Sequence, residues 1–175
     1  MTDYGLLAKQ IVSLAEVDAH CLPVLSNAAA LLWDALDDIN WAGFYLVDPV
    51  TVAGEGAELG VALSAPEPRT PELRLGPFQG KVACVRISFG RGVCGTAAAT
   101  KTSQLVEDVH QFPGHIACDS ASNSEVVVPI FEGDQVVGVL DIDSPSVARF
   151  TQGDLAGLEQ VVKALENCVD FSDFC

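Results

Sequence analysis

Three of the six cysteines form a group in the middle of the chain, at Cys84, Cys94 and Cys118. Cys118 is flanked by His115 and Asp119 in a segment that has neither helical nor strand periodicity. Irregular segments lie at the surface and often carry function, so Cys118 is the candidate nucleophile. A thiolate that attacks an oxidised substrate is itself oxidised, and a second thiol of the group can then resolve it as a disulfide.

The same three cysteines could bind zinc together with His110 or His115. Structural zinc sites usually contain two cysteines only a few residues apart, and this group contains no such pair. We therefore favour redox chemistry over a metal site, and we expect no cofactor. Cys84, on a predicted strand, is equally consistent with a buried core thiol. The residues alone leave its role open.

Three carboxyl groups near strand ends form a second candidate cluster. Asp141 and Asp143 are two residues apart on a predicted strand, so their side chains share a face. Glu125 joins that face only if the connecting hairpin has a three-residue loop, Glu132 to Asp134, which pairs Glu125 with Asp141. We predict this loop. Such a patch raises the pKa of at least one carboxyl group, and its remaining charge favours an ammonium ligand.

A glycine motif, Gly90-Arg-Gly-Val-Cys-Gly95, matches the dinucleotide fingerprint G-x-G-x-x-G between a predicted strand and a predicted helix. That fingerprint requires a parallel βαβ unit, whereas the strands here are short and mostly joined as hairpins. We predict instead a tight turn that exposes backbone N–H groups at a helix N-terminus beside Cys94.

The elements that must position these groups follow from periodicity and turn residues. Helices are predicted over 3–18, with Thr2 or Asp3 as N-cap, and over 23–37, 93–100 and 152–169. Strands are predicted over 40–47, 72–78, 81–88, 104–109, 125–131 and 135–142. A tight turn near Gln79 and Gly80 is expected to join the second strand to the third.

Hairpin-connected strands between N-terminal and C-terminal helices indicate an α+β fold, with a mostly antiparallel sheet covered by helices. Glycines and prolines punctuate residues 49–71 and predict a long surface loop inserted between two strands. We interpret residues 1–175 as one domain.

Composition limits the function classes. The chain has 175 residues, is 49% hydrophobic and carries a net charge of -15. The acidic balance argues against nucleic acid and anionic membranes as partners. No targeting segment opens the chain and no run of about 18 apolar residues occurs, so we expect a cytoplasmic protein. In that compartment the cysteines are expected to be thiols or redox centres and not structural disulfides.

Four motifs together resemble the free methionine-(R)-sulfoxide reductases, which are single-domain GAF proteins. They are Gly90-Arg-Gly-Val-Cys-Gly-Thr96, Val109-His-x-x-x-x-His-Ile-Ala-Cys118, Ser122-Asn-Ser-Glu-Val126 and Gly138-Val-Leu-Asp-Ile-Asp-Ser144. The segments Trp41–Leu46 and Leu75–Gly80 are also similar. The resemblance extends from about residue 20 to 165, and ordinary GAF sensor domains lack the cysteine trio.

The resemblance implies a redox cycle. Cys118 attacks the sulfoxide sulfur, methionine leaves and a sulfenic acid remains on the cysteine. Cys84 is then the expected resolving partner, with Cys94 as a second or alternative one. Thioredoxin reduces the resulting disulfide.

The resemblance also implies a substrate site. Glu125, Asp141 and Asp143 match carboxyl groups that hold the free amino acid and help to protonate the sulfoxide oxygen. Trp41 and Tyr45 are expected to contact the substrate methyl group, although strand aromatics are more often core residues.

Two alternative functions would involve no catalytic turnover. One is a GAF-type module that binds a small molecule, and the other is a thiol redox sensor whose signal is a Cys84–Cys118 disulfide. The sequence leaves open whether the chain forms a homodimer.

Overall fold

The computed structural model describes residues 2–48, 71–114 and 121–171. The predicted loop at 49–71 lies almost wholly outside these ranges, and so does Cys118. The helices within them are α1 (Tyr4–Ala15), α2 (Cys21–Ala35), α3 (Gly92–Thr100), the 3-10 helix η2 (Val109–Gln111) and α4 (Gln152–Cys168). The strands are β1 (Trp41–Val47), β2 (Glu72–Gly80), β3 (Arg86–Ser88), β4 (Gln104–Val106), β5 (Ser124–Glu132) and β6 (Gln135–Ser144).

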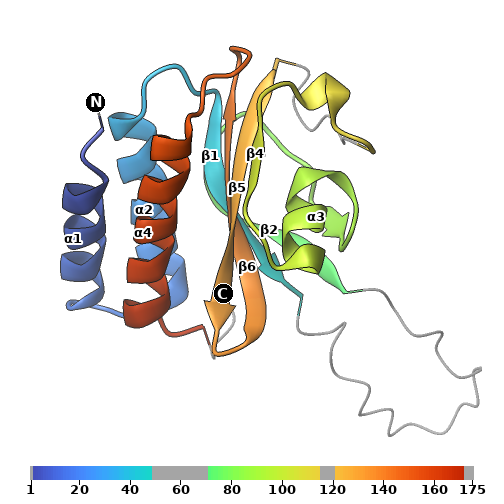
Figure 1. Cartoon of the computed structure of the whole chain (residues 1–175). Coiled ribbons are helices and arrows are strands. Elements are labelled where there is room, and N and C mark those ends of the chain that lie inside the picture. Colours follow the sequence, from blue (N-terminus) through green and yellow to red (C-terminus); the bar gives the residue numbers. More distant parts are fainter. Residues whose placement is uncertain (1, 49–70, 115–120, 172–175) are drawn as a thin grey trace, which may run out of the picture.

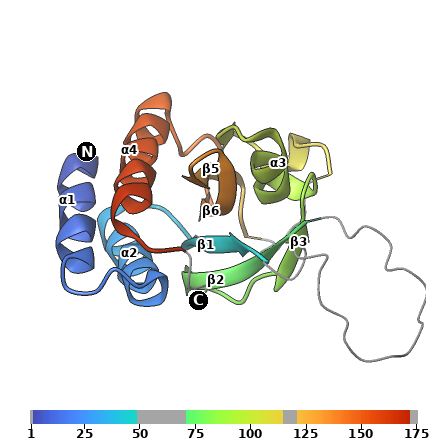
Figure 2. The same cartoon turned by 90° about the horizontal axis from the view of Figure 1, so that it is seen from below.

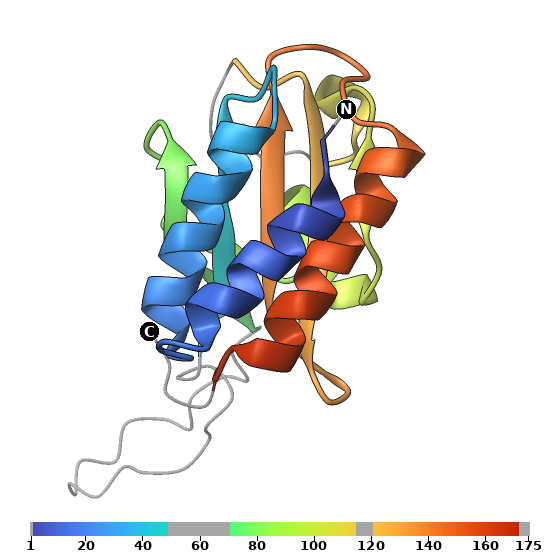
Figure 3. The same cartoon turned by 90° about the vertical axis from the view of Figure 1, so that its left-hand side faces the viewer.

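The strands form one antiparallel sheet in the order β3-β2-β1-β6-β5-β4. Helices α1, α2 and α4 lie on one face of this sheet and α3 lies on the other (Figures 1 and 2). Figure 3 shows the first group from outside, with α1 packed against both α2 and α4. The predicted α+β fold is confirmed.

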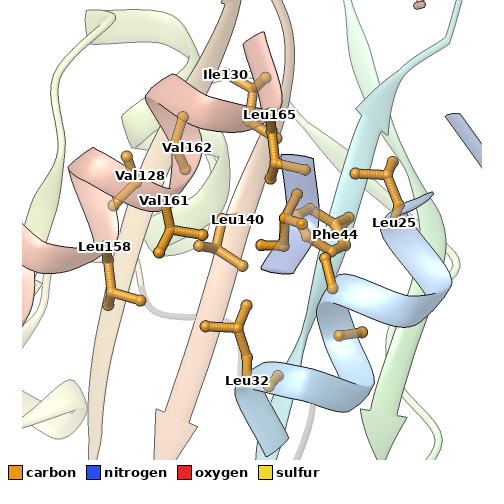
Figure 4. Close-up of a cluster of buried hydrophobic side chains, with 14 of the residues drawn as sticks. Leu25, Leu32, Phe44, Val128, Ile130, Leu140, Leu158, Val161, Val162 and Leu165 are labelled. Atoms are coloured by element: carbon orange, nitrogen blue, oxygen red, sulfur yellow. The ribbon is translucent and has the colours of Figure 1, made fainter. Parts of the chain in front are cut away.

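Apolar side chains fill both interfaces of the sheet. The core beneath the three-helix face is drawn in Figure 4 and includes Leu25, Leu32, Phe44, Leu140, Leu158 and Leu165. The core beneath α3 includes Trp41, Tyr45, Ala97, Val127 and Val139. Strands covered on both faces are apolar at successive positions, as β1 and β5 are here. Any polar group beneath α3 therefore sits in a largely dry environment.

Helix starts follow their capping residues. Asp3, one of the two predicted N-caps, accepts a hydrogen bond from the backbone N–H of Leu6 at 2.9 Å. Helix α2 begins two residues before the predicted start, because the His20 ring accepts from the N–H of Leu22 and caps it. Thr151 and Asp154 form a reciprocal capping box at the start of α4.

Two predicted strands are shorter in the structure than expected. β3 covers only Arg86–Ser88, because it pairs with Glu72–Arg74 and the chain between the paired segments forms a wide connection instead of a tight hairpin. β4 ends at Val106. Beyond it the Asp108 side chain accepts from the N–H of His110 and starts the 3-10 helix η2. The Asp108 side chain thus binds a backbone N–H group beyond Val106, and β4 ends before the predicted position.

The β5–β6 hairpin differs from its prediction in a way that matters for the site. Glu132 pairs with Gln135, so the turn has two residues and the predicted three-residue loop is wrong. The left-handed φ of +58° at Gly133 suits such a turn. A register shift follows at once, since Phe131 pairs with Val136 but Ile130 pairs with Gly138.

The extra residue, Val137, forms a β-bulge that shifts the pairing by one residue. Glu125 consequently lies opposite Asp143, not opposite Asp141 as predicted. It still shares a face with both aspartates. The face was predicted correctly for the wrong reason.

Gly157 allows α4 to pack closely on α1, because a Cβ at this position would overlap the Tyr4 ring. We expect Gly157→Ala to lower the free energy of unfolding by about 1–3 kcal/mol from overpacking, although alanine raises helix propensity by about 1 kcal/mol. Urea unfolding measures the change. Gly5→Ala is the matched control, since its Cβ would meet nothing closer than 3.4 Å. Equal midpoints for the two variants would contradict the packing argument.

None of the described helices combines the length and apolar character that crossing a membrane requires.

Candidate active site

A thiol and two carboxyl groups meet on the face of the sheet that α3 covers. Cys94 Sγ, on α3, donates to Glu125 Oε1, on β5, over 3.9 Å. Asp141, on β6, completes the group, because one ligand atom from each of the three lies within 4.8 Å of the others. The three residues are only 4%, 6% and 6% exposed. We call this group the buried cluster.

A glycine turn brings Cys94 to the sheet. Gly90 and Gly92 have φ of +79° and +60°, which side chains rarely tolerate. A Cβ at Gly95 would overlap the carbonyl oxygen of Ser88, so this glycine lets α3 approach β3. The predicted tight turn is confirmed, and the antiparallel sheet provides no βαβ unit for a dinucleotide. The use of its N–H groups stays a prediction.

Burial raises the pKa values of the two acids in the cluster. It raises the pKa of Glu125 well above its usual value, with further increases from the charges of Asp141 and Asp143. Burial also raises the pKa of Asp141 to about 7, although hydrogen bonding with Cys94 and Glu125 opposes the rise. The expectation that crowding raises at least one carboxyl pKa is thus supported. Desolvation contributes more to these shifts than the neighbouring charges do.

The Cys94 thiol is held in its neutral form by the same surroundings. Burial raises its pKa well above the usual value, and the charges of Asp141 and Glu125 raise it further. A thiol is nucleophilic only as thiolate. Cys94 is therefore placed to donate a hydrogen bond rather than to attack.

Asp141 has an unsatisfied oxygen. Its Oδ1 is buried and finds no hydrogen-bond partner among the described residues. An unpaired buried acceptor typically costs about 1–3 kcal/mol. Asp143, two residues further along β6, is half-buried on the same face. The cluster thus presents an acceptor that a ligand could satisfy.

Two aromatic residues flank the acids on β1. Trp41 pairs with Asp143 and Gly43 pairs with Asp141, so alternate β1 residues point to the acid face. The Trp41 and Tyr45 rings stack at 5.7 Å between centroids, and both residues are buried. Burial, then the charge of Asp141, raises the pKa of Tyr45 and keeps its hydroxyl neutral.

The described cysteines differ in state. Cys84 is half-buried in the irregular segment before β3 and is disulfide-bonded. Cys94 and Cys168 are free. Cys21, at the start of α2, is also disulfide-bonded. The expectation that no cysteine forms a structural disulfide is therefore wrong for Cys21, which packs in the core of the three-helix face away from the site.

The predicted zinc alternative that involved His110 finds no support among the described residues. The His110 ring is exposed at the surface and lies 2.9 Å from Asp108 Oδ1. The second histidine, His115, falls outside the described residues together with the candidate nucleophile Cys118.

The contribution of Gly43 and Phe78 was not predicted from the sequence. The Phe78 ring stacks on Trp41 with 5.3 Å between centroids, and a Cβ at Gly43 would overlap Phe78. The alternation Trp41, Gly43, Tyr45 on one strand could have indicated that Gly43 lets a neighbouring aromatic ring pack closely there.

Comparison with known proteins places this chain in a family. The GAF domain family profile matches residues 30–170. The chain is 46% identical over 171 residues to the free methionine-R-sulfoxide reductase of Escherichia coli, which covers 98% of this chain and 91% of that protein. The chain belongs to the free methionine-R-sulfoxide reductase family. The enzyme of that name from Saccharomyces cerevisiae is 47% identical over 170 residues, with 94% of this chain and 83% of that protein covered.

Solved structures agree with the reductase family assignment. The reduced form of the Staphylococcus aureus fRMsr matches with a TM-score of 0.81 at 48% identity, and the match covers 97% of each chain. The same protein in complex with its substrate gives a TM-score of 0.80. The matches extend over β1, α3, β5 and β6, which carry the described part of the site.

Proposed function

We propose that this chain reduces free methionine (R)-sulfoxide to methionine. The observation that carries the proposal is a buried pair of carboxyl groups with raised pKa values, Glu125 and Asp141, in a chain of the free methionine-R-sulfoxide reductase family. Reduction of a sulfoxide by a thiol needs an acid at the oxygen, and a carboxyl group kept neutral near pH 7 can supply it.

Cys118 is the proposed nucleophile. Its thiolate attacks the sulfoxide sulfur while the oxygen takes up a proton. The oxygen passes to the cysteine sulfur, methionine leaves, and Cys118 becomes a sulfenic acid. A second thiol then attacks that sulfur, so a disulfide forms and the oxygen departs as water. Thioredoxin supplies the two electrons that reopen the disulfide.

Glu125 is the proposed acid. Its pKa is raised well above its usual value by burial and by the charges of both aspartates, so it can hold a proton near pH 7. Asp141 and Asp143 carry the remaining negative charge and bind the α-ammonium group of the free amino acid. A methionine sulfoxide within a protein lacks that ammonium group. Trp41 and Tyr45 provide the apolar wall against which the substrate methyl group packs.

Cys84 is the better candidate for the resolving thiol. It is half-buried and disulfide-bonded, whereas Cys94 is only 4% exposed and its pKa is raised by burial. Thioredoxin must reach one sulfur of the disulfide, and attack by the second thiol requires a thiolate. Both requirements favour Cys84. A reducing cytoplasm would suit a cycle that depends on free thiols and thioredoxin.

The direct test is incubation of the protein with the separate R and S epimers of free methionine sulfoxide, together with thioredoxin, its reductase and NADPH. We expect NADPH consumption with the R epimer only. Equal rates for both epimers, or none for either, would reject the assignment. A thiol redox sensor would form the Cys84 disulfide yet show no turnover, so the same assay separates that rival from the enzyme.

Replacing Cys84 with serine should stop the cycle after its first half. Cys118 can still accept oxygen, so about one methionine is expected per enzyme, without thioredoxin-driven turnover. Rapid quench and amino acid analysis measure this burst. Cys94→Ser is the matched comparison, and its thioredoxin-driven turnover is expected to persist. Full turnover by Cys84→Ser together with a single burst by Cys94→Ser would exchange the two roles.

A further inference from the structure

We propose that the reduced protein binds an exchangeable, thiophilic divalent cation of the zinc class in the buried cluster, through Cys94, Glu125 and Asp141. Binding of the ion stands on the geometry of the cluster alone. That the ion inhibits turnover by competing with substrate rests on the proposed function. The ion is not proposed as a permanent cofactor. It occupies the site only when the substrate is absent.

The three ligand atoms are already nearly close enough together to coordinate one zinc ion. Zinc binds thiolate sulfur at about 2.3 Å and carboxylate oxygen at about 2.1 Å, so a tetrahedral ion holds such a pair roughly 3.5 Å apart. Cys94 Sγ and Glu125 Oε1 are 3.9 Å apart. The whole set, including Asp141, lies within 4.8 Å. Small side-chain rotations would therefore suffice, without movement of the strands.

Asp141 supplies a second, independent indication. Asp141 forms hydrogen bonds with Cys94 and Glu125, but its Oδ1 is buried and has no hydrogen-bond partner among the described residues. A cation there would satisfy this oxygen and would also offset the charge of the acids, which burial otherwise makes unfavourable. This buried oxygen can therefore still accept a hydrogen bond or coordinate a cation.

The donor set selects the kind of ion. One sulfur and two oxygen ligands favour zinc or cadmium, because a thiolate is a poor ligand for magnesium or calcium. Three protein ligands also leave a fourth position for water, as in zinc sites that exchange ligands. Glu125 and Asp141 are the groups proposed to engage the substrate, so ion and substrate should exclude one another.

The experiment titrates Zn²⁺ into the reduced, full-length protein by calorimetry and repeats it with Cd²⁺, whose bond to thiolate gives an ultraviolet charge-transfer band. The titrations use a Cys84→Ser/Cys118→Ser protein, called the host, because it lacks the two thiols of the proposed redox cycle and keeps Cys94. We expect one ion per chain in that host. Adding Cys94→Ser or Asp141→Asn should weaken binding at least about tenfold each, and Mg²⁺ should not compete.

Cys168→Ser is the matched control, since Cys168 is also a free thiol but packs beside the three-helix core. It should bind Zn²⁺ like its parent. In the enzyme with all its cysteines, Zn²⁺ should raise KM for the sulfoxide without lowering kcat. Binding that survives Cys94→Ser, or that Cys168→Ser removes, would overturn the proposal. Because the host protein is expected to have no turnover, its ion binding is judged independently of whether the chain is a reductase.

Discussion

A Cys118→Ser protein is expected to reduce free methionine (R)-sulfoxide at least about 1,000-fold more slowly than the unaltered chain. Serine keeps the size of the side chain but replaces a thiolate with a hydroxyl group that is hardly ionised near pH 7 and is a far weaker nucleophile. The buried acids stay in place, so substrate binding should persist. NADPH consumption with thioredoxin and its reductase measures turnover, and calorimetry measures binding.

Cys168→Ser provides the comparison for this variant, because it removes a free thiol of the same chain that lies outside the buried cluster. Its turnover should equal that of the parent. If Cys118→Ser keeps more than a few per cent of the activity, Cys118 is not the nucleophile and the reaction must begin at another thiol.

Replacing Asp141 with asparagine should lower activity and raise stability. The variant keeps the shape of the side chain but loses the charge that is proposed to hold the ammonium group and to maintain the proton on Glu125. A general acid, here the proposed Glu125 whose proton Asp141 helps to maintain, typically contributes about 100-fold or more. We expect a loss of at least that size in kcat/KM, with the R epimer still preferred.

The gain in stability depends on pH in a defined direction. Burial raises the pKa of Asp141 from 3.8 to about 7 in the folded protein. Between those values the folded chain holds a proton that the unfolded chain has released, so stability falls as pH rises from about 4 to about 7 and then levels off. Asparagine removes this penalty. At pH 8 the free energy of unfolding of the variant should therefore exceed that of the parent by up to about 4 kcal/mol, at 1.36 kcal/mol per pKa unit.

Urea unfolding across pH 4 to 8 measures the effect, and the difference between variant and parent should grow with pH. Asp134→Asn is the matched control, since Asp134 lies exposed in the turn of the same hairpin. Its difference should stay near zero. A gap for Asp141→Asn that is constant with pH would show that Asp141 does not titrate in this window.

Much of the architecture could be predicted because helical and strand periodicities are local properties of the sequence. Helices α1 and α4 follow their apolar stripes and their caps, and the apolar runs of β5 and β6 were recognised. The ends of β3 and β4 could not be predicted, since they depend on which backbone groups meet a partner strand. For β4 the deciding contact is a single side chain, Asp108.

The candidate site was predictable in its residue types and not in its distances. The two-residue spacing of Asp141 and Asp143 was enough to place them on one face. The approach of Cys94 to Glu125 depends on how α3 packs over the sheet, which no local pattern encodes. The extent of their burial, which determines their pKa values, is likewise a tertiary property. The disulfide state of Cys21 gave no sequence signal.

Because Val137 sets the pairing of β5 with β6, the site is sensitive to the register of this hairpin, in a place where the insertion or deletion of a residue is usually tolerated. Without the bulge, the two-residue turn would pair Glu125 with Ile142, whose side chain packs in the apolar three-helix core. Glu125 would then lie on the opposite face of the sheet from Asp141 and Asp143. Anyone who grafts this acid cluster onto another GAF scaffold must therefore transfer the irregular strand along with the functional side chains. A GAF domain that pairs these two strands regularly after a two-residue turn cannot assemble the cluster, even if it keeps both aspartates.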